Sequence, residues 1–117
     1  MTKAAKAKGR LGQQEIRDVL LKAFPQLEPD DIKSTVMGDT GADIQLSPAA
    51  RKLIPISIEI KRRKSALKTV YAWMKQADNH TDNPPVVFYR SDRQGWLVVS
   101  ELDHYVKLLK DSRNDTS

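Results

Sequence analysis

The most informative stretch of the chain is residues 55–64, PISIEIKRRK, in which isoleucine stands at every second position. Side chains two apart in a strand share one face, so the three isoleucines point one way, and Glu59 and Lys61 point the other way. The unbroken isoleucine face predicts a strand that packs on the core. The polar face is either an ordinary solvated surface or a site that performs chemistry.

The chain has 117 residues, a length typical of one domain. We expect residues 1–10 to be a flexible basic arm, residues 11–111 a single domain and residues 112–117 a disordered tail. Cysteine is absent, which excludes disulfides and thiolate metal sites. No run of 18 apolar residues predicts a membrane span, and no apolar stretch follows the basic N-terminus as in an export signal. We therefore expect a cytoplasmic protein with no membrane partner.

Basic residues cluster in two stretches of the sequence. Residues 1–10 hold four Lys or Arg and no acid, and residues 51–68 hold seven Lys or Arg against Glu59 alone. The rest of the chain is net acidic. Such local excess favours a polyanion-binding face over uniform solubilising charge. The structural alternative is a disordered tail and the solvated start of a helix.

Hydrophobic periodicity and turn residues predict the order of the elements. We expect a helix over residues 12–24, strands over 32–37, 43–47 and 54–61, and a helix over 65–80. Residues 48–53 are expected to be a connection. Strands over 86–90 and 95–100 and a helix over 101–110 complete the chain. This order predicts a mixed α/β domain whose helices cover a sheet.

Asp43 gives the polar face of residues 55–64 a second meaning. It opens the strand over 43–47, and a hairpin between that strand and residues 55–61 would bring it near Glu59 and Lys61. Two converging carboxylates are natural ligands of a hard divalent cation such as Mg²⁺. A nearby ammonium can orient an attacking water and offset the charge that develops on a phosphate. This arrangement suits phosphodiester hydrolysis.

Residues 41–65, GADIQLSPAARKLIPISIEIKRRKS, resemble the active-site region of the PD-(D/E)xK nucleases. Asp43 matches the motif aspartate, with Ala42 where proline often stands, and residues 59–61, Glu-Ile-Lys, match the (D/E)xK. The resemblance covers residues 11–90 and implies an α/β fold with a restriction-endonuclease-like αβββαβ core, a central mixed sheet flanked by helices. It is nearest to small phage endonucleases and Holliday junction resolvase-like proteins.

The resemblance also implies roles for individual residues. Asp43 and Glu59 would bind one or two Mg²⁺ ions, for which Mn²⁺ substitutes, with the backbone carbonyl of Ile60 as a further ligand. Lys61 would position the water nucleophile. Glu15, on the first helix, would complete the carboxylate set.

The implied activity is that of a Mg²⁺-dependent endodeoxyribonuclease in the cytoplasm of a phage-infected or bacterial host cell. Its substrate would be branched, Holliday junction-like DNA or duplex DNA. A homodimer is expected, because one chain offers one site and symmetric cutting of two strands needs two. The residues expected to hold the DNA backbone are Arg51, Lys52, Arg62, Arg63, Lys64, Lys8 and Arg10. The alternative function is a non-catalytic nucleic-acid-binding module with a nuclease-like fold.

Each candidate site residue also has a purely structural interpretation. Asp39 lies in the same glycine-containing turn as Asp43 and is the rival ligand. Glu59 and Lys61 are, in the structural alternative, a surface ion pair on a half-solvated strand. Glu15 is then an ordinary exposed helix residue.

Other residues are expected to be structural. Trp73 and Trp96 are predicted to pack rather than to stack on bases. Gln76 is expected on the surface of its helix, although related nucleases can carry a polar residue there. His80 and His104 have no partner at ligand spacing and are expected to be structural or exposed.

Overall fold

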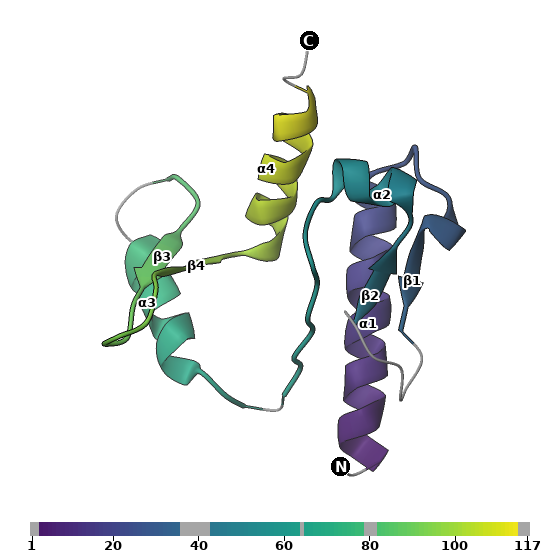
Figure 1. The fold of residues 1–117 in the computed structure, drawn as a ribbon. Helices are drawn as coiled ribbons and strands as arrows, with labels where there is room; N and C mark the ends of the chain where they lie inside the picture. The colour runs from purple at the N-terminus through teal and green to yellow at the C-terminus, as the bar shows by residue number, and fades with distance from the viewer. Residues whose placement is uncertain (1–2, 36–42, 64, 79–81, 115–117) are drawn as a thin grey trace. The chain divides into compact units, whose positions relative to one another are not determined.

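A computed structural model describes residues 3–35, 43–63, 65–78 and 82–114, and it is mixed α/β (Figure 1). The chain divides into two compact units. The first contains Met1–Lys64 with Leu109–Ser117, and the second contains Ser65–Leu108. Each unit holds one of the two sheets of the described residues, and these sheets share no strand. No helix among the described residues is long and apolar enough to cross a membrane.

The first unit is a helix packed on a small antiparallel hairpin. It contains α1 (Lys3–Ala23), the short 3₁₀ helix η1 (Pro29–Asp31), β1 (Ile32–Ser34), β2 (Ile44–Leu46) and α2 (Pro48–Leu53). Ile32 pairs with Leu46 and Ser34 with Ile44. The helix α1 runs alongside β1 (Figure 1). Residues 48–53, expected to be a connection, form α2.

The helix α1 begins at Lys3, so the prediction of a flexible arm over residues 1–10 is wrong for residues 3–10. Residues 3–8, KAAKAK, consist of alanine and lysine, which are strong helix formers, and the helix extends through them. At the other end of the chain, α4 (Leu102–Asn114) includes residues 112–114, which the sequence assigned to a disordered tail.

The core of the first unit joins α1 to the hairpin. Leu20 of α1 and Phe24, which directly follows the helix, pack with Ile32, Ile44 and Ile54, and all five side chains are buried. Full burial of one such side chain contributes about 1.5–3 kcal/mol, so these contacts are the main stabilisation of the unit.

The start of α2 is tied to η1 through two side chains. The Ser47 hydroxyl accepts the Ala50 N–H at 3.1 Å, as an N-cap does, and donates to Asp31 Oδ1 at 2.7 Å. Asp31 Oδ2 accepts the Glu28 N–H at 2.8 Å. The hydrogen bonds from Ser47 and Glu28 lower the pKa of Asp31.

Residues 54–63 run extended but form no regular strand, so the strand predicted over 54–61 is wrong as a ladder element. The Asp43 N–H donates to the Ile58 carbonyl at 2.9 Å. The Ile60 N–H, however, donates to the side-chain carboxylate of Asp43 and not to a backbone carbonyl, so no regular ladder forms. The predicted alternation is confirmed: Ile56, Ile58 and Ile60 are half-buried against the core, whereas Glu59 is exposed.

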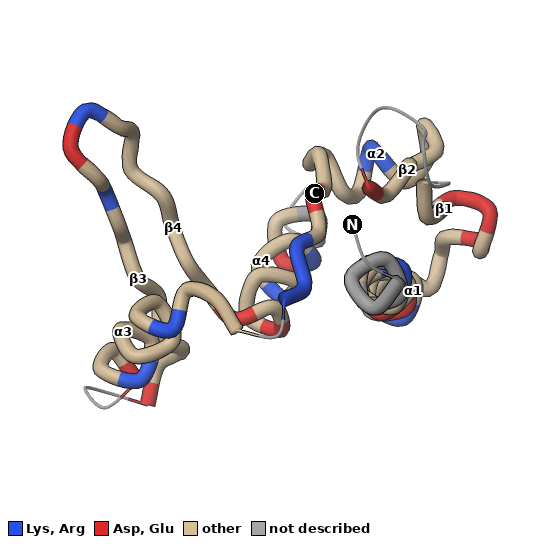
Figure 2. The backbone as a smooth tube through the Cα atoms, turned by 90° about the horizontal axis from the view of Figure 1, so that it is seen from below, with Lys and Arg blue, Asp and Glu red and all other residues tan. Residues whose placement is uncertain are grey.

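The second unit contains a helix and a hairpin. It comprises α3 (Lys68–Asp78), β3 (Val86–Tyr89), β4 (Leu97–Ser100) and the start of α4. The two strands predicted over 86–90 and 95–100 are confirmed and pair antiparallel, with Val86 opposite Ser100 and Tyr89 opposite Leu97. The turn between them carries both charge signs (Figure 2). In place of a central mixed sheet, the described residues hold two separate two-stranded antiparallel sheets.

Candidate metal and nucleic-acid site

Asp43 connects β1, β2 and the extended segment. Its carbonyl accepts the Thr35 N–H at 2.9 Å, and its own N–H donates to the Ile58 carbonyl at 2.9 Å. Its carboxylate Oδ2 accepts the Ile60 N–H at 2.6 Å. Both the backbone and the side chain of Asp43 therefore hold the segment that carries Glu59 and Lys61. The sequence predicts this proximity of Asp43 to the segment from a hairpin between residues 43–47 and 55–61.

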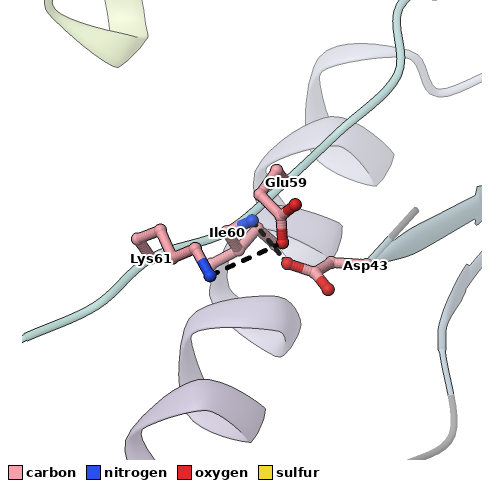
Figure 3. Close-up of polar contacts among 4 residues, drawn as sticks. All are labelled: Asp43, Glu59, Ile60 and Lys61. Carbon is pink, nitrogen blue, oxygen red and sulfur yellow. Dashed lines mark hydrogen bonds and ion pairs between the residues drawn. The ribbon is translucent and has the colours of Figure 1, made fainter. Parts of the chain in front are cut away.

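The alternation of side chains places Asp43 and Glu59 on the same side of the unit. Asp43 precedes the buried Ile44, so its side chain points away from the core. Glu59 lies between Ile58 and Ile60, which pack against the core, so it also points outward. In Figure 3 the two carboxylates point toward one another.

Lys61 lies beside Glu59, with its Nζ 3.9 Å from Glu59 Oε1 (Figure 3). The side chains of Lys61 and Glu59 are 68% and 71% exposed. An exposed pair of this kind contributes about 0–1 kcal/mol, because solvent screens it and both side chains lose rotamer freedom. Both groups can therefore turn toward a ligand at little cost in stability.

The donor set suits a hard cation. The two carboxylates offer oxygen ligands, and a carboxylate has about four lone-pair sites, so Asp43 keeps capacity beyond its bond to Ile60. The N–H and C=O of one extended residue point to the same side, which directs the Ile60 carbonyl toward the side of Asp43. These residues fit a Mg²⁺ ion that keeps several of its waters.

A third carboxylate does not join this pair within the part of the chain that the structure describes. There, no group of three or more His, Asp or Glu side chains is placed to hold a metal ion. Glu15 is exposed on α1, outside any such group. Asp39, the rival ligand, lies outside the described residues. Gln76 is exposed on α3, as expected.

The basic residues gather in two places on the first unit. Arg62 and Arg63 are exposed and directly follow Lys61, and Arg51 and Lys52 are exposed in the last turn of α2. The extended segment separates these two pairs (Figure 1). Arg10 is exposed on α1, to which Lys8 also belongs, and Lys64 lies outside the described residues.

Net charge distinguishes the two units. Residues 65–108 hold five Lys or Arg and five Asp or Glu, so the formal net charge of +5 belongs entirely to the first unit. The unit that carries Asp43, Glu59 and Lys61 is therefore also the one that carries the net positive charge.

The two tryptophans differ in their surroundings. Trp73 packs as predicted, with its ring stacked on Tyr89 at a centroid distance of 5.3 Å. The prediction that Trp96 packs is wrong, since Trp96 follows the hairpin turn and is 66% exposed. His104 is half-buried on α4, and His80 lies outside the described residues.

A groove of about 580 Å³ lies in the second unit, lined by residues of α3 and of the β4–α4 junction, Tyr71, Met74 and Val99 among them. None of the predicted site residues lines it. Glu59 and Lys61 lie on an exposed surface instead, and Asp43 is half-buried.

Sequence reasoning missed one residue that contacts the candidate site. Gly12 is buried on α1 against Ile60 and Arg62. The available signal was a glycine inside an otherwise regular helical pattern, which commonly has a packing reason.

A scan against protein-family models and searches of curated proteins and of solved structures found no match for this chain.

Proposed function

We propose that the protein is a metal-dependent DNA endonuclease of the PD-(D/E)xK type, which hydrolyses phosphodiester bonds. One observation carries the proposal: the Asp43 carboxylate is fixed by the Ile60 N–H at 2.6 Å, on the outward side from which Glu59 and Lys61 project. A carboxylate held beside the middle residue of a Glu-x-Lys sequence is the arrangement that the sequence resemblance requires.

Each residue has a distinct role in this proposal. Asp43, Glu59 and the Ile60 carbonyl would hold the cation, Mg²⁺ or Mn²⁺, which would supply activation of a water and neutralisation of charge on the scissile phosphate. Lys61 positions the water for attack, and its ammonium stabilises the negative charge that develops on the phosphate. Glu15, about one turn beyond Gly12 on α1, would complete the carboxylate set through a bridging water.

The order of the elements supports a restriction-endonuclease-like core. The first unit supplies a helix, two strands and the extended residues 54–63, and the second unit continues with α3 and β3. The order would correspond to αβββαβ if residues 54–63 take the place of the third strand and α2 is an insertion before them.

DNA is the proposed partner because of the charge around the site. Arg62 and Arg63 follow Lys61 directly and would hold backbone phosphates next to the carboxylates. Branched, Holliday junction-like DNA or duplex DNA is the proposed substrate. Two copies of the chain would act together, because cutting both strands needs two sites.

The test is incubation of the protein with supercoiled plasmid and with a synthetic four-way junction, in Mg²⁺ or in EDTA. The proposal predicts cleavage in Mg²⁺ that is absent in EDTA and in Glu59→Gln. Glu101→Gln, an exposed charge removal in the second unit, is the matched control and should cut normally. If the wild-type protein shifts both DNAs on a gel and cuts neither, the proposed activity is wrong and the chain is a binding module.

A further inference from the structure

Gly12 marks a close crossing between α1 and the segment that carries the candidate site. A Cβ built on Gly12 would lie 3.2 Å from Ile60 Cγ2, and 3.6 and 3.7 Å from Cβ and Cδ of Arg62. The first distance is shorter than an ordinary van der Waals contact. Gly9, on the same helix, has nothing within 4 Å of such an atom. The two glycines of α1 therefore differ in their surroundings: Gly12 faces Ile60 and Arg62, whereas Gly9 faces open space.

Glycine destabilises a helix interior relative to alanine, so Gly12 weakens the helix in which it stands. Space explains its presence, since any larger residue would press on Ile60. A residue that breaks a local rule of this kind is expected where function or close packing requires it.

The crossing fixes Ile60 from two directions. Its side chain lies on Gly12, and its N–H donates to Asp43. Glu59 and Lys61 flank Ile60 in the chain, so their positions relative to Asp43 follow from where Ile60 is held. A shift of Ile60 away from α1 would move both of them.

The same contact places a basic residue of the extended segment on a helix that is distant in sequence. The aliphatic part of the Arg62 side chain lies on Gly12, which places Arg62 beside α1 and its N-terminal half. That half carries Arg10 and the other basic residues of the first cluster. Arg62, from the second basic stretch, therefore lies on the helix whose backbone includes the first stretch.

We propose that Gly12 is a positioning residue for the Asp43–Glu59–Lys61 site. Its missing side chain lets residues 60–62 lie directly on α1, which sets the distance of Glu59 and Lys61 from Asp43. The inference rests on the proposed nuclease function for its catalytic meaning, but the geometry that it describes is measurable without cleavage.

The experiment compares Gly12→Ala with Gly9→Ala, since both add the same methyl group to the same helix. The first readout is the amide proton shift of Ile60, which reports the hydrogen bond to Asp43. Gly12→Ala should shift this signal upfield as the bond lengthens, and Gly9→Ala should leave it in place. An unchanged Ile60 signal in Gly12→Ala overturns the inference, whether or not the protein cuts DNA.

The second readout is the cleavage rate, if the wild-type protein cuts. Gly12→Ala should lower kcat about 10-fold with little change in KM, because the reacting groups are misplaced while DNA contacts remain. Gly9→Ala should keep the wild-type rate. If the wild-type protein does not cleave DNA, the proposed function is contradicted, and the Ile60 amide shift remains the test of the role of Gly12.

Ile60→Leu provides a rescue that is specific to the contact. Leucine keeps the volume of isoleucine but lacks Cγ2, the atom nearest to the added methyl group. The double variant Gly12→Ala/Ile60→Leu should recover towards the rate and amide shift of Ile60→Leu alone. A purely additive effect of the two substitutions would show that the contact does not position the site.

Discussion

Asp43 should contribute to stability as well as to cation binding, and two substitutions separate these roles. Asp43→Ala removes the acceptor of the Ile60 N–H, which is a hydrogen bond of 2.6 Å to a charged group at a half-buried position. A bond of this type contributes about 1.5–3 kcal/mol, and partial solvent access reduces the expected loss to about 1–2 kcal/mol. At about 4–8 °C per kcal/mol for a domain of this size, Tm should fall by about 4–16 °C.

Asp43→Asn keeps an acceptor oxygen for Ile60 but lacks the negative charge that a cation needs. Its stability should lie within about 1 kcal/mol of the wild type, while Mg²⁺-dependent cleavage is lost. Thermal unfolding followed by circular dichroism measures the first quantity, and the plasmid assay measures the second. The reasoning is refuted if Asp43→Ala unfolds at the wild-type temperature, or if Asp43→Asn is destabilised as much as Asp43→Ala.

Three further outcomes follow from the structure. Glu59→Gln and Lys61→Met should abolish cleavage. They should change the free energy of unfolding by no more than about 0.5 kcal/mol, because both side chains are exposed. A large loss of stability in either variant would contradict a site role. Asp31→Asn should lower Tm at pH 7. Because folding lowers the pKa of Asp31, the difference in Tm between the variant and the wild type should shrink as the pH falls below about 4. A Tm difference that stays constant from pH 7 to pH 3 would argue against the Ser47 contact. Ile54→Ala should cost about 2–5 kcal/mol in denaturant unfolding, since this side chain has no exposed surface, and a loss below about 1 kcal/mol would place Ile54 outside the core.

The isoleucine alternation in residues 54–61 predicted which face meets the core and which faces water. It also predicted, together with Asp43 at the head of the preceding strand, which residues come together. Both are consequences of the two-residue period of an extended chain, which sequence displays directly. The Ile60 N–H bonds to the Asp43 carboxylate and not to a backbone carbonyl of a neighbouring strand. This choice of acceptor depends on the local path of the chain, which periodicity does not specify.

The N-terminal residues show a different limit. The charge of residues 3–8 suggests a solvated arm, whereas their alanine and lysine content favours the helix that forms. Trp96 shows a third limit of sequence-based prediction. Tertiary packing decides whether an aromatic side chain after a turn is covered, and Trp96 is exposed. The Gly12 contact joins residues about 50 positions apart, and composition alone carries no information on such a pairing.

The central claim is that Asp43 and Glu59 share a divalent cation. Titration of isotope-labelled protein with Mn²⁺ tests it directly, because the paramagnetic ion broadens the amide signals of residues close to it. The account predicts selective loss of the signals of Asp43 and residues 59–61 at low Mn²⁺, competition by Mg²⁺, and no such loss in Asp43→Asn. Broadening elsewhere in the chain, or equal broadening in Asp43→Asn, would contradict it.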